Sequence, residues 1–66
     1  MKLTKAQCTY FKFRNWYAAE GYAKWAAHHI NHILYIYFIR GRFHVSLVSP
    51  KGRLEEHLIR VVDPCG

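Results

Sequence analysis

The chain has 66 residues, 52% of them hydrophobic, and ten Lys and Arg against four Asp and Glu give it a formal net charge of +6. This length allows one small domain, residues 1–66, and leaves no room for a second. The longest apolar run, residues 33–39, is far shorter than the roughly 20 residues of a membrane-spanning helix, so we expect no membrane span. The positive charge favours polyanionic partners, meaning nucleic acid, an anionic membrane or an acidic protein surface.

Two cysteines, Cys8 and Cys65, stand near the two ends of the chain. A secreted domain of this size usually carries more, because disulfides compensate for a small core. The N-terminal residues lack the charged leader, apolar run and small-residue cleavage site of a signal peptide. We therefore expect a cytoplasmic protein with reduced cysteines, and a disulfide between Cys8 and Cys65 is the alternative.

The segment from Thr4 carries the signals of a helix N-terminus. Thr4 and Gln7 have the spacing of a capping box, in which the Thr hydroxyl accepts from the Gln amide and the Gln side chain reaches back. Behind this cap, four residues recur at helical spacing, namely Ala6, Tyr10, Phe13 and Tyr17. We therefore expect a first helix that begins at Thr4.

A second helical stripe follows, with the spacing of a core-facing helix. Its members are Tyr22, Trp25, Ala26, His29, Ile30 and Ile33. Glu20 and Lys24 add an i,i+4 pair of favourable polarity. A single helix over residues 4–31 would be roughly 42 Å long, which is too long for so small a domain. We therefore expect a break near Glu20 and Gly21, because Gly weakens a helix.

Two β-branched and aromatic runs, residues 33–39 and 43–48, predict a β-hairpin around Arg40-Gly41-Arg42. With Arg40 and Gly41 as a two-residue turn, one face of the hairpin is wholly apolar, and a slip of one residue spoils this separation. The predicted register pairs Phe38 with Phe43, Ile36 with Val45 and Leu34 with Leu47. The other face then displays Tyr35, Tyr37, His44 and Ser46.

Residues 53–62 are compatible with two structures. The preceding Ser49-Pro50-Lys51-Gly52 is typical of a type I turn between strands, and alternate residues from position 57 to 61 can line a strand. Leu54 and Leu58 also have helical spacing, so a C-terminal helix is the alternative to a third strand. We favour the strand. The predicted fold is α+β, with one or two N-terminal helices packed on a three-stranded antiparallel β-meander.

Five histidines raise the question of a metal site. His28 and His32 have the i,i+4 spacing that lets two imidazoles reach one ion. The motif lacks the intervening Glu of the helical metalloproteases, and no spacing selects a third ligand. His29 lies on the predicted apolar stripe, where a core histidine would lie. We therefore expect neither a metal nor any other cofactor.

No complete catalytic motif is present. His29 or His44 could pair with Glu55 or Glu56 for acid–base chemistry, but nothing in the sequence places them beside a nucleophile. Small bacterial ribonuclease toxins work with a single catalytic His on a comparable framework, and this analogy of fold leaves such an activity open. We expect a non-enzymatic binding protein with no catalytic residues.

The placement of basic residues favours nucleic acid, with DNA and RNA both open. The first nineteen residues hold no acid, and both predicted turns are basic. In a meander these turns lie at opposite ends of the sheet, so cations would bracket the tyrosine face. Bases could stack on its rings, with Trp16 as a further candidate, while cations neutralise phosphates. The expected interface comprises Lys5, Lys12, Arg14, Tyr35, Tyr37, Arg40, Arg42, His44, Lys51 and Arg53.

The same face also supports a protein partner. Tyr35, Tyr37, Ile39 and Val48 would form an apolar patch of the kind that marks interfaces, and Tyr and Arg are enriched at binding hot spots. Through this patch, or through a free sheet edge, the chain could form a homodimer or act as a phage-type inhibitor or adaptor. The sequence thus predicts a small basic regulatory protein, with nucleic acid favoured over a protein partner.

Overall fold

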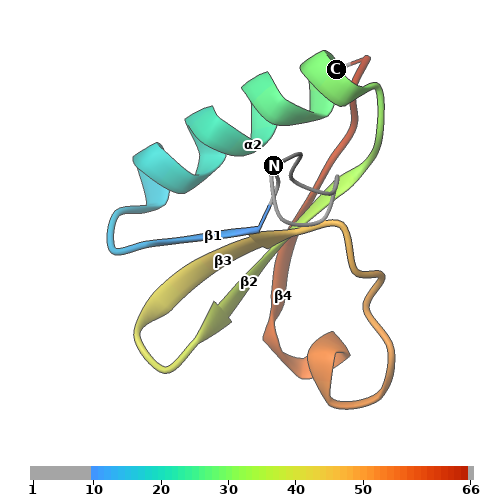
Figure 1. The fold of residues 1–66 in the computed structure, drawn as a ribbon. Helices are drawn as coiled ribbons and strands as arrows, with labels where there is room; N and C mark the ends of the chain where they lie inside the picture. The colour runs from blue at the N-terminus through green and yellow to red at the C-terminus, as the bar shows by residue number, and fades with distance from the viewer. Residues whose placement is uncertain (1–9, 66) are drawn as a thin grey trace, which may run out of the picture.

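A computed structural model describes residues 10–65 of the chain (Figure 1). In chain order its elements are β1 (Phe11–Phe13), α2 (Trp16–Ile30), β2 (Leu34–Ile39), β3 (Arg42–Ser46), a 3-10 helix η1 (Gly52–His57) and β4 (Leu58–Val62). The strands form one antiparallel sheet in the order β1-β3-β2-β4, and α2 lies across one face of it. The predicted α+β class is confirmed, whereas the arrangement differs from helices on a three-stranded meander.

The predicted first helix is wrong over residues 10–15, where the part of the chain that the structure describes begins. Its cap at Thr4 lies outside the described residues, but Phe11–Phe13 form a strand that pairs with β3. The alternation of Phe, Lys and Phe explains the strand, because Phe13 packs against the core while Lys12 points to the opposite face. Tyr10 and Phe13 have helical spacing, yet the period-two pattern prevails here.

The helix α2 begins at Trp16, between the predicted start of the first helix at Thr4 and the second stripe at Tyr22, and it is continuous through Gly21. Asn15 caps it, since its side-chain oxygen accepts from the backbone N–H of Tyr17 at 2.7 Å. At the other end, Asn31 adopts the left-handed conformation with φ of 55°. The predicted break near Glu20 is therefore wrong. With β1 in place of a first helix, α2 is roughly 22 Å long and fits the domain without bending.

The buried side of α2 is a stripe of alanines and not the predicted aromatic stripe. The buried residues of the helix are Ala19, Ala23, Ala26 and Ala27. Trp25 is 60% exposed, and His29 is exposed and stacks on Trp25 instead of entering the core. Small side chains let the helix lie close to the sheet, where Leu34, Ile36, Val45 and Val62 complete the core. The wide rings are left on the flanks of the helix.

The hairpin of β2 and β3 has the predicted register. Ile36 pairs with Val45 and Phe38 with Phe43. Arg40 and Gly41 both have positive φ, at 50° and 77°, as a two-residue type I′ turn requires. Leu47 lies just beyond the end of β3, so its predicted pairing with Leu34 is not formed.

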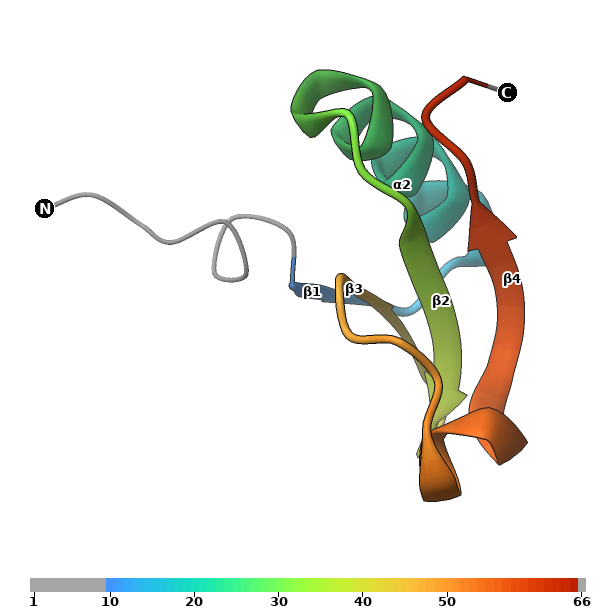
Figure 2. The same ribbon diagram turned by 90° about the vertical axis from the view of Figure 1, so that its right-hand side faces the viewer.

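The last strand is confirmed, but its position in the sheet is not the predicted one. Residues 58–62 form β4 and residues 52–57 form η1, so the alternative of a C-terminal helix is wrong. In a meander β4 would lie beside β3, whereas it pairs with β2. β3 and β4 are therefore parallel to each other, and the chain between them must return along the sheet before β4 begins. Figure 2 shows this orange segment descending from the end of β3 to η1 at the lower end of the sheet.

Candidate nucleic-acid interface

Residues 47–51, which connect β3 to η1 and which we call the returning segment, cover part of the sheet face opposite α2. Tyr37 lies on this face and is only 2% exposed. Its hydroxyl donates a hydrogen bond of 2.5 Å to the carbonyl of Val48, and the N–H of Val48 donates to the Ser46 hydroxyl at 3.0 Å. Burial raises the pKa of Tyr37, with a smaller contribution from the neighbouring Tyr35. These bonds attach the returning segment to β2 and β3.

The stacking role predicted for Tyr37 does not fit this geometry, because a buried ring offers no face to a base. Tyr35 is partly exposed, and its ring centroid lies 6.4 Å from that of Tyr37. Trp16, the further stacking candidate, is half-buried and packs edge-on against Phe43 at 5.6 Å. All three rings pack against other side chains of the domain, and the ring of Tyr37 is almost completely buried.

His44 is also buried, at 9% exposure, and therefore does not offer the surface contact predicted for it. Its Nδ1 lies 2.8 Å from the Tyr10 hydroxyl, within a hydrogen bond. Burial lowers the pKa of His44, the nearby Lys12 lowers it further, and a hydrogen bond with the backbone of Ile39 acts in the opposite direction. The neutral ring is thus favoured, and it holds Tyr10 in place.

Tyr10 is the aromatic residue that the sequence reasoning missed on this face. Its ring is 45% exposed and meets the His44 ring edge-on, with 5.9 Å between centroids. The prediction had placed Tyr10 on a helical stripe. The signal that could have found it is the alternation through Tyr10, Lys12 and Arg14, which places a ring beside two positive charges on one side of the chain.

The basic residues near Tyr10 come from two strands and the turn beside them. Lys12 pairs with His44 across β1 and β3, and Arg42 stands two residues before His44, so both belong to the face opposite α2. Arg40 lies in the adjoining turn and Arg14 directly follows β1. We call this group the basic face, comprising Lys12, Arg14, Arg40 and Arg42.

The ion pairs of the structure leave the basic face unneutralised. Glu20 binds Arg60 at 2.6 Å and lies 4.0 Å from Lys24. These are the ion pairs found among residues 10–65, and neither involves a member of the basic face. Moreover, β1, β2 and β3 contain no acidic residue, because the chain has no acid before Glu20 and none between Glu20 and Glu55. Positive charge therefore dominates three neighbouring strands.

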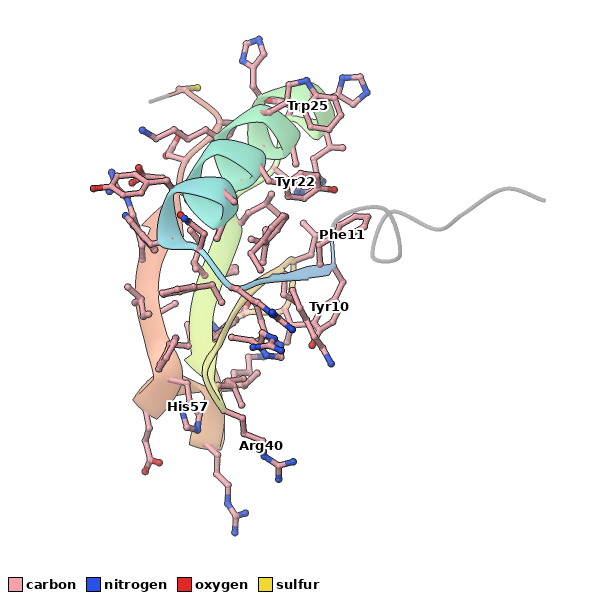
Figure 3. All side chains as sticks on the ribbon, turned by 90° about the vertical axis from the view of Figure 1, so that its left-hand side faces the viewer. Tyr10, Phe11, Tyr22, Trp25, Arg40 and His57 are labelled. Atoms are coloured by element: carbon pink, nitrogen blue, oxygen red, sulfur yellow. The ribbon has the colours of Figure 1, made fainter. Side chains whose placement is uncertain are left out.

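Lys51 and Arg53 lie at the same end of the sheet as the β2–β3 turn, not at the opposite end as a meander predicts. The cause is the return of the chain to the start of β4, and Figure 3 shows Arg40 and His57 at this common end. Glu55 and Glu56 stand in the same 3-10 helix as Arg53 and offset its charge locally. Lys5, also predicted to contact nucleic acid, lies outside the described residues.

A row of aromatic side chains runs from β1 up one flank of α2. The ring centroids of Phe11 and Tyr22 are 5.0 Å apart, and those of Tyr22 and Trp25 are 6.0 Å apart. Trp25 stacks on His29 at 5.0 Å with only 10° between the ring planes. We call this row the aromatic column, comprising Phe11, Tyr22, Trp25 and His29. Figure 3 shows Trp25, Tyr22, Phe11 and Tyr10 in descending order on one side of the molecule.

The remaining histidines and cysteines among the described residues form no further candidate site. His28 and His32 are exposed, and within the described part of the chain no group of three or more His, Cys, Asp or Glu residues could hold a metal ion. Cys65 is free and exposed, whereas Cys8 falls outside residues 10–65. No helix in this part of the chain has the length and apolar character needed to cross a membrane.

Comparisons with protein families, with curated proteins and with solved structures find no match for this chain. The candidate binding surfaces of the chain are the basic face with Tyr10 and the aromatic column.

Proposed function

We propose that this protein is a non-enzymatic regulator that binds nucleic acid through the basic face. The observation that carries the proposal is the distribution of charge. Four basic side chains on or beside β1 and β3 have no ion-pair partner among residues 10–65, and the three neighbouring strands hold no acid. Such a surface attracts phosphates and releases their counterions, which accounts for most sequence-independent affinity.

The position of Tyr10 supports the same function. Its half-exposed ring lies on the face that also carries Lys12 and Arg42, and the bond to His44 fixes its hydroxyl end. An ordered ring beside cations is suited to stack on a base while the cations contact the neighbouring phosphates. We therefore propose for Tyr10 the stacking role that was predicted for Tyr37.

The binding role is favoured over catalysis because of how His44 is held. It is the histidine nearest to the basic face, yet it is buried, and the Tyr10 hydroxyl occupies its Nδ1. A general base must reach the proton that it abstracts, and His44 is engaged in packing instead. This is why we propose a structural role for His44 and a non-enzymatic role for the protein.

The test compares two double variants of equal charge. Lys12→Gln with Arg42→Gln removes charge from the basic face, whereas Lys51→Gln with Arg53→Gln removes the same charge near Glu55 and Glu56. Fluorescence anisotropy of labelled RNA and DNA at about 50 and 200 mM salt measures both the affinity and its salt dependence. We expect the first variant to weaken binding more and to reduce the slope of log K against log salt by about 1.4 for a single strand.

Two outcomes would contradict the proposal. If the two double variants lose affinity equally, the attraction comes from net charge and not from the basic face. If the wild-type chain binds neither RNA nor DNA at the lower salt, the protein does not act on nucleic acid.

A protein partner is the second candidate function, and the edge strand β4 favours it. Ile59 and Val61 of β4 are 48% and 49% exposed, and Val48 of the returning segment is 56% exposed. Val61 pairs with Tyr35, so this apolar strip adjoins the covered part of the sheet. An exposed edge with apolar side chains can pair with a second copy or with another protein as an inhibitor or adaptor. Sedimentation of the wild type and of Val61→Lys tests this, since a dimer formed here should dissociate in the variant.

A further inference from the structure

We infer that the nucleic acid is single-stranded and that its bases stack on the aromatic column. This inference rests on the proposed function and adds the class of ligand and a second contact surface. It starts from the position of β1, which is an edge strand of the sheet. Lys12 lies on one side of this strand, and Phe11 lies on the other side against Tyr22 of α2. The edge strand therefore joins the basic face to the aromatic column.

Three rings of the column, those of Phe11, Trp25 and His29, are exposed, whereas Tyr22 packs partly buried against the core. Trp25 is 60% exposed and Phe11 is 44% exposed. The buried residues of α2 are alanines, so the core of the domain does not use the indole. Leaving an indole on a helix surface forgoes much of the roughly 150–250 Å² that an aromatic side chain can bury. An aromatic group so placed is available to a ligand.

The contact between Trp25 and His29 prepares the indole for stacking. The two rings are nearly parallel, at 10° and 5.0 Å, and stand one turn apart on α2. The imidazole restricts the rotation of the indole, so less side-chain entropy is lost when a base stacks on it. Tyr22, one turn before Trp25 on α2, contacts the Trp25 ring, and Phe11 of β1 contacts Tyr22. The row of rings therefore continues towards the basic face.

The charge of the neighbouring surface selects the ligand. The flank of α2 that carries Tyr22, Trp25 and His29 has no acidic side chain, because Glu20 and its partner Arg60 lie towards β4. A polyanion is therefore attracted along β1 and is not repelled along the column. Only unpaired bases can place their faces on these rings, because the bases of a duplex are already stacked on one another. Rings and cations together thus favour a single strand over a duplex.

The experiment uses a labelled oligonucleotide of about 12 nucleotides, which is within the usual site size, as a single strand and as a duplex of the same sequence. Trp25→Ala is compared with Tyr17→Ala, a matched control on the same helix. Tyr17 is 80% exposed and does not belong to the column. We expect Trp25→Ala to weaken single-strand binding by about 5-fold to 100-fold and to leave duplex binding within about 2-fold. Tyr17→Ala should leave both within about 2-fold.

Each outcome separates this inference from the proposed function. If single strand and duplex bind equally and Trp25→Ala changes neither, the column does not stack on bases, while the basic face still binds phosphates. If the wild type binds neither ligand, the proposed function itself fails. If Tyr17→Ala matches Trp25→Ala, the effect is not that of the column. Circular dichroism of both variants shows that the fold persists, which is expected because both side chains are largely exposed.

Discussion

The sheet face opposite α2 has two halves that differ in cover and in charge. The β2–β4 half lies under the segment that returns from β3, and its central ring, Tyr37, is 2% exposed. Among residues 10–65 no such segment covers the edge of the β1–β3 half, where Tyr10 is 45% exposed beside Lys12. The first half stabilises the domain, and the second half presents the surface on which the proposed function depends.

The difference between the halves comes from one connection. Because β4 pairs with β2, the chain must travel the length of the sheet after β3, and it does so over the ring of Tyr37. The same path brings Lys51 and Arg53 to the end of the sheet that carries Arg40. A small domain gains buried area in this way, and part of its open sheet face is covered as a result.

The largest expected effect is on stability and separates the two central tyrosines. Tyr37→Ala removes a fully buried ring and should lower the free energy of unfolding by about 3–5 kcal/mol. This loss is comparable with the whole stability of so small a domain. Tyr10→Ala should cost far less, because its ring is half-exposed, and should weaken nucleic-acid binding instead. Thermal unfolding measures the change in stability, and fluorescence anisotropy measures the change in nucleic-acid binding. A larger loss of stability in Tyr10→Ala, or a loss of binding in Tyr37→Ala alone, would contradict the difference between the two halves.

A moderate effect is expected when the returning segment loses its hydrogen bond. Tyr37→Phe keeps the ring and removes the hydroxyl that donates to the Val48 carbonyl. The free energy of unfolding should fall by about 1 kcal/mol, and amide hydrogen exchange after β3 should become faster. Ser46→Ala, which loses the acceptor of the Val48 N–H, is the matched variant and should give a similar change. No change in exchange in either variant would show that these bonds do not hold the segment.

A smaller, pH-dependent effect is expected from His44 in the β1–β3 half. Burial and Lys12 hold the pKa of His44 below its ordinary value of 6.5, so the unfolded chain binds a proton there more readily than the native chain. The stability that this neutral ring contributes is present above pH 6.5 and is lost as the pH falls through the lowered pKa. Urea unfolding at about pH 7.5 and about pH 5 measures the loss.

Two variants assign this pH dependence to its cause. Lys12→Gln removes one of the influences that lower the pKa of His44, so the pKa should move towards its ordinary value in an NMR titration of the ring. In His44→Gln the part of the acid loss that belongs to this residue should disappear. An unchanged acid loss in His44→Gln would assign it to other groups.

The smallest effect is expected at the outer edge of the β2–β4 half. Val61→Thr changes an exposed strand residue and should alter the free energy of unfolding by less than about 0.5 kcal/mol. It should also leave nucleic-acid affinity unchanged, because β4 is the strand farthest from β1. Loss of nucleic-acid binding in this variant would show that the two halves act as one surface.

Local pattern made the hairpin and the last strand predictable. The alternation of apolar and polar residues and the Arg40-Gly41 turn specify the pairing of Ile36 with Val45, because a slip of one residue exchanges the two faces. The same reasoning failed at β1, where Tyr10 and Phe13 fit a helical period, whereas Phe11, Lys12 and Phe13 fit an alternating one. Three strand residues are too few for periodicity to choose between them.

The candidate site was predictable in its charges and not in its rings. Lys12, Arg14, Arg40 and Arg42 stay on the surface because their charge is costly to bury, so the sequence alone locates them. The exposure of a tyrosine depends on what covers it, since its ring is stable both in the core and at the surface. For this reason Tyr37, which was expected on the surface, is buried, and Tyr10, which was expected on a helical stripe, is half-exposed.

The sequence by itself determined an α+β domain with a strongly basic surface, the register of β2 with β3 and the existence of β4. These depend on interactions between residues close along the chain, namely the turn and the alternating pattern. Only the tertiary structure decided that the alanines of α2 face the sheet, that β4 lies beside β2 and that the returning segment covers Tyr37. These features depend on contacts between distant segments, where several strand orders satisfy the same local pattern and the best burial of the whole chain selects one.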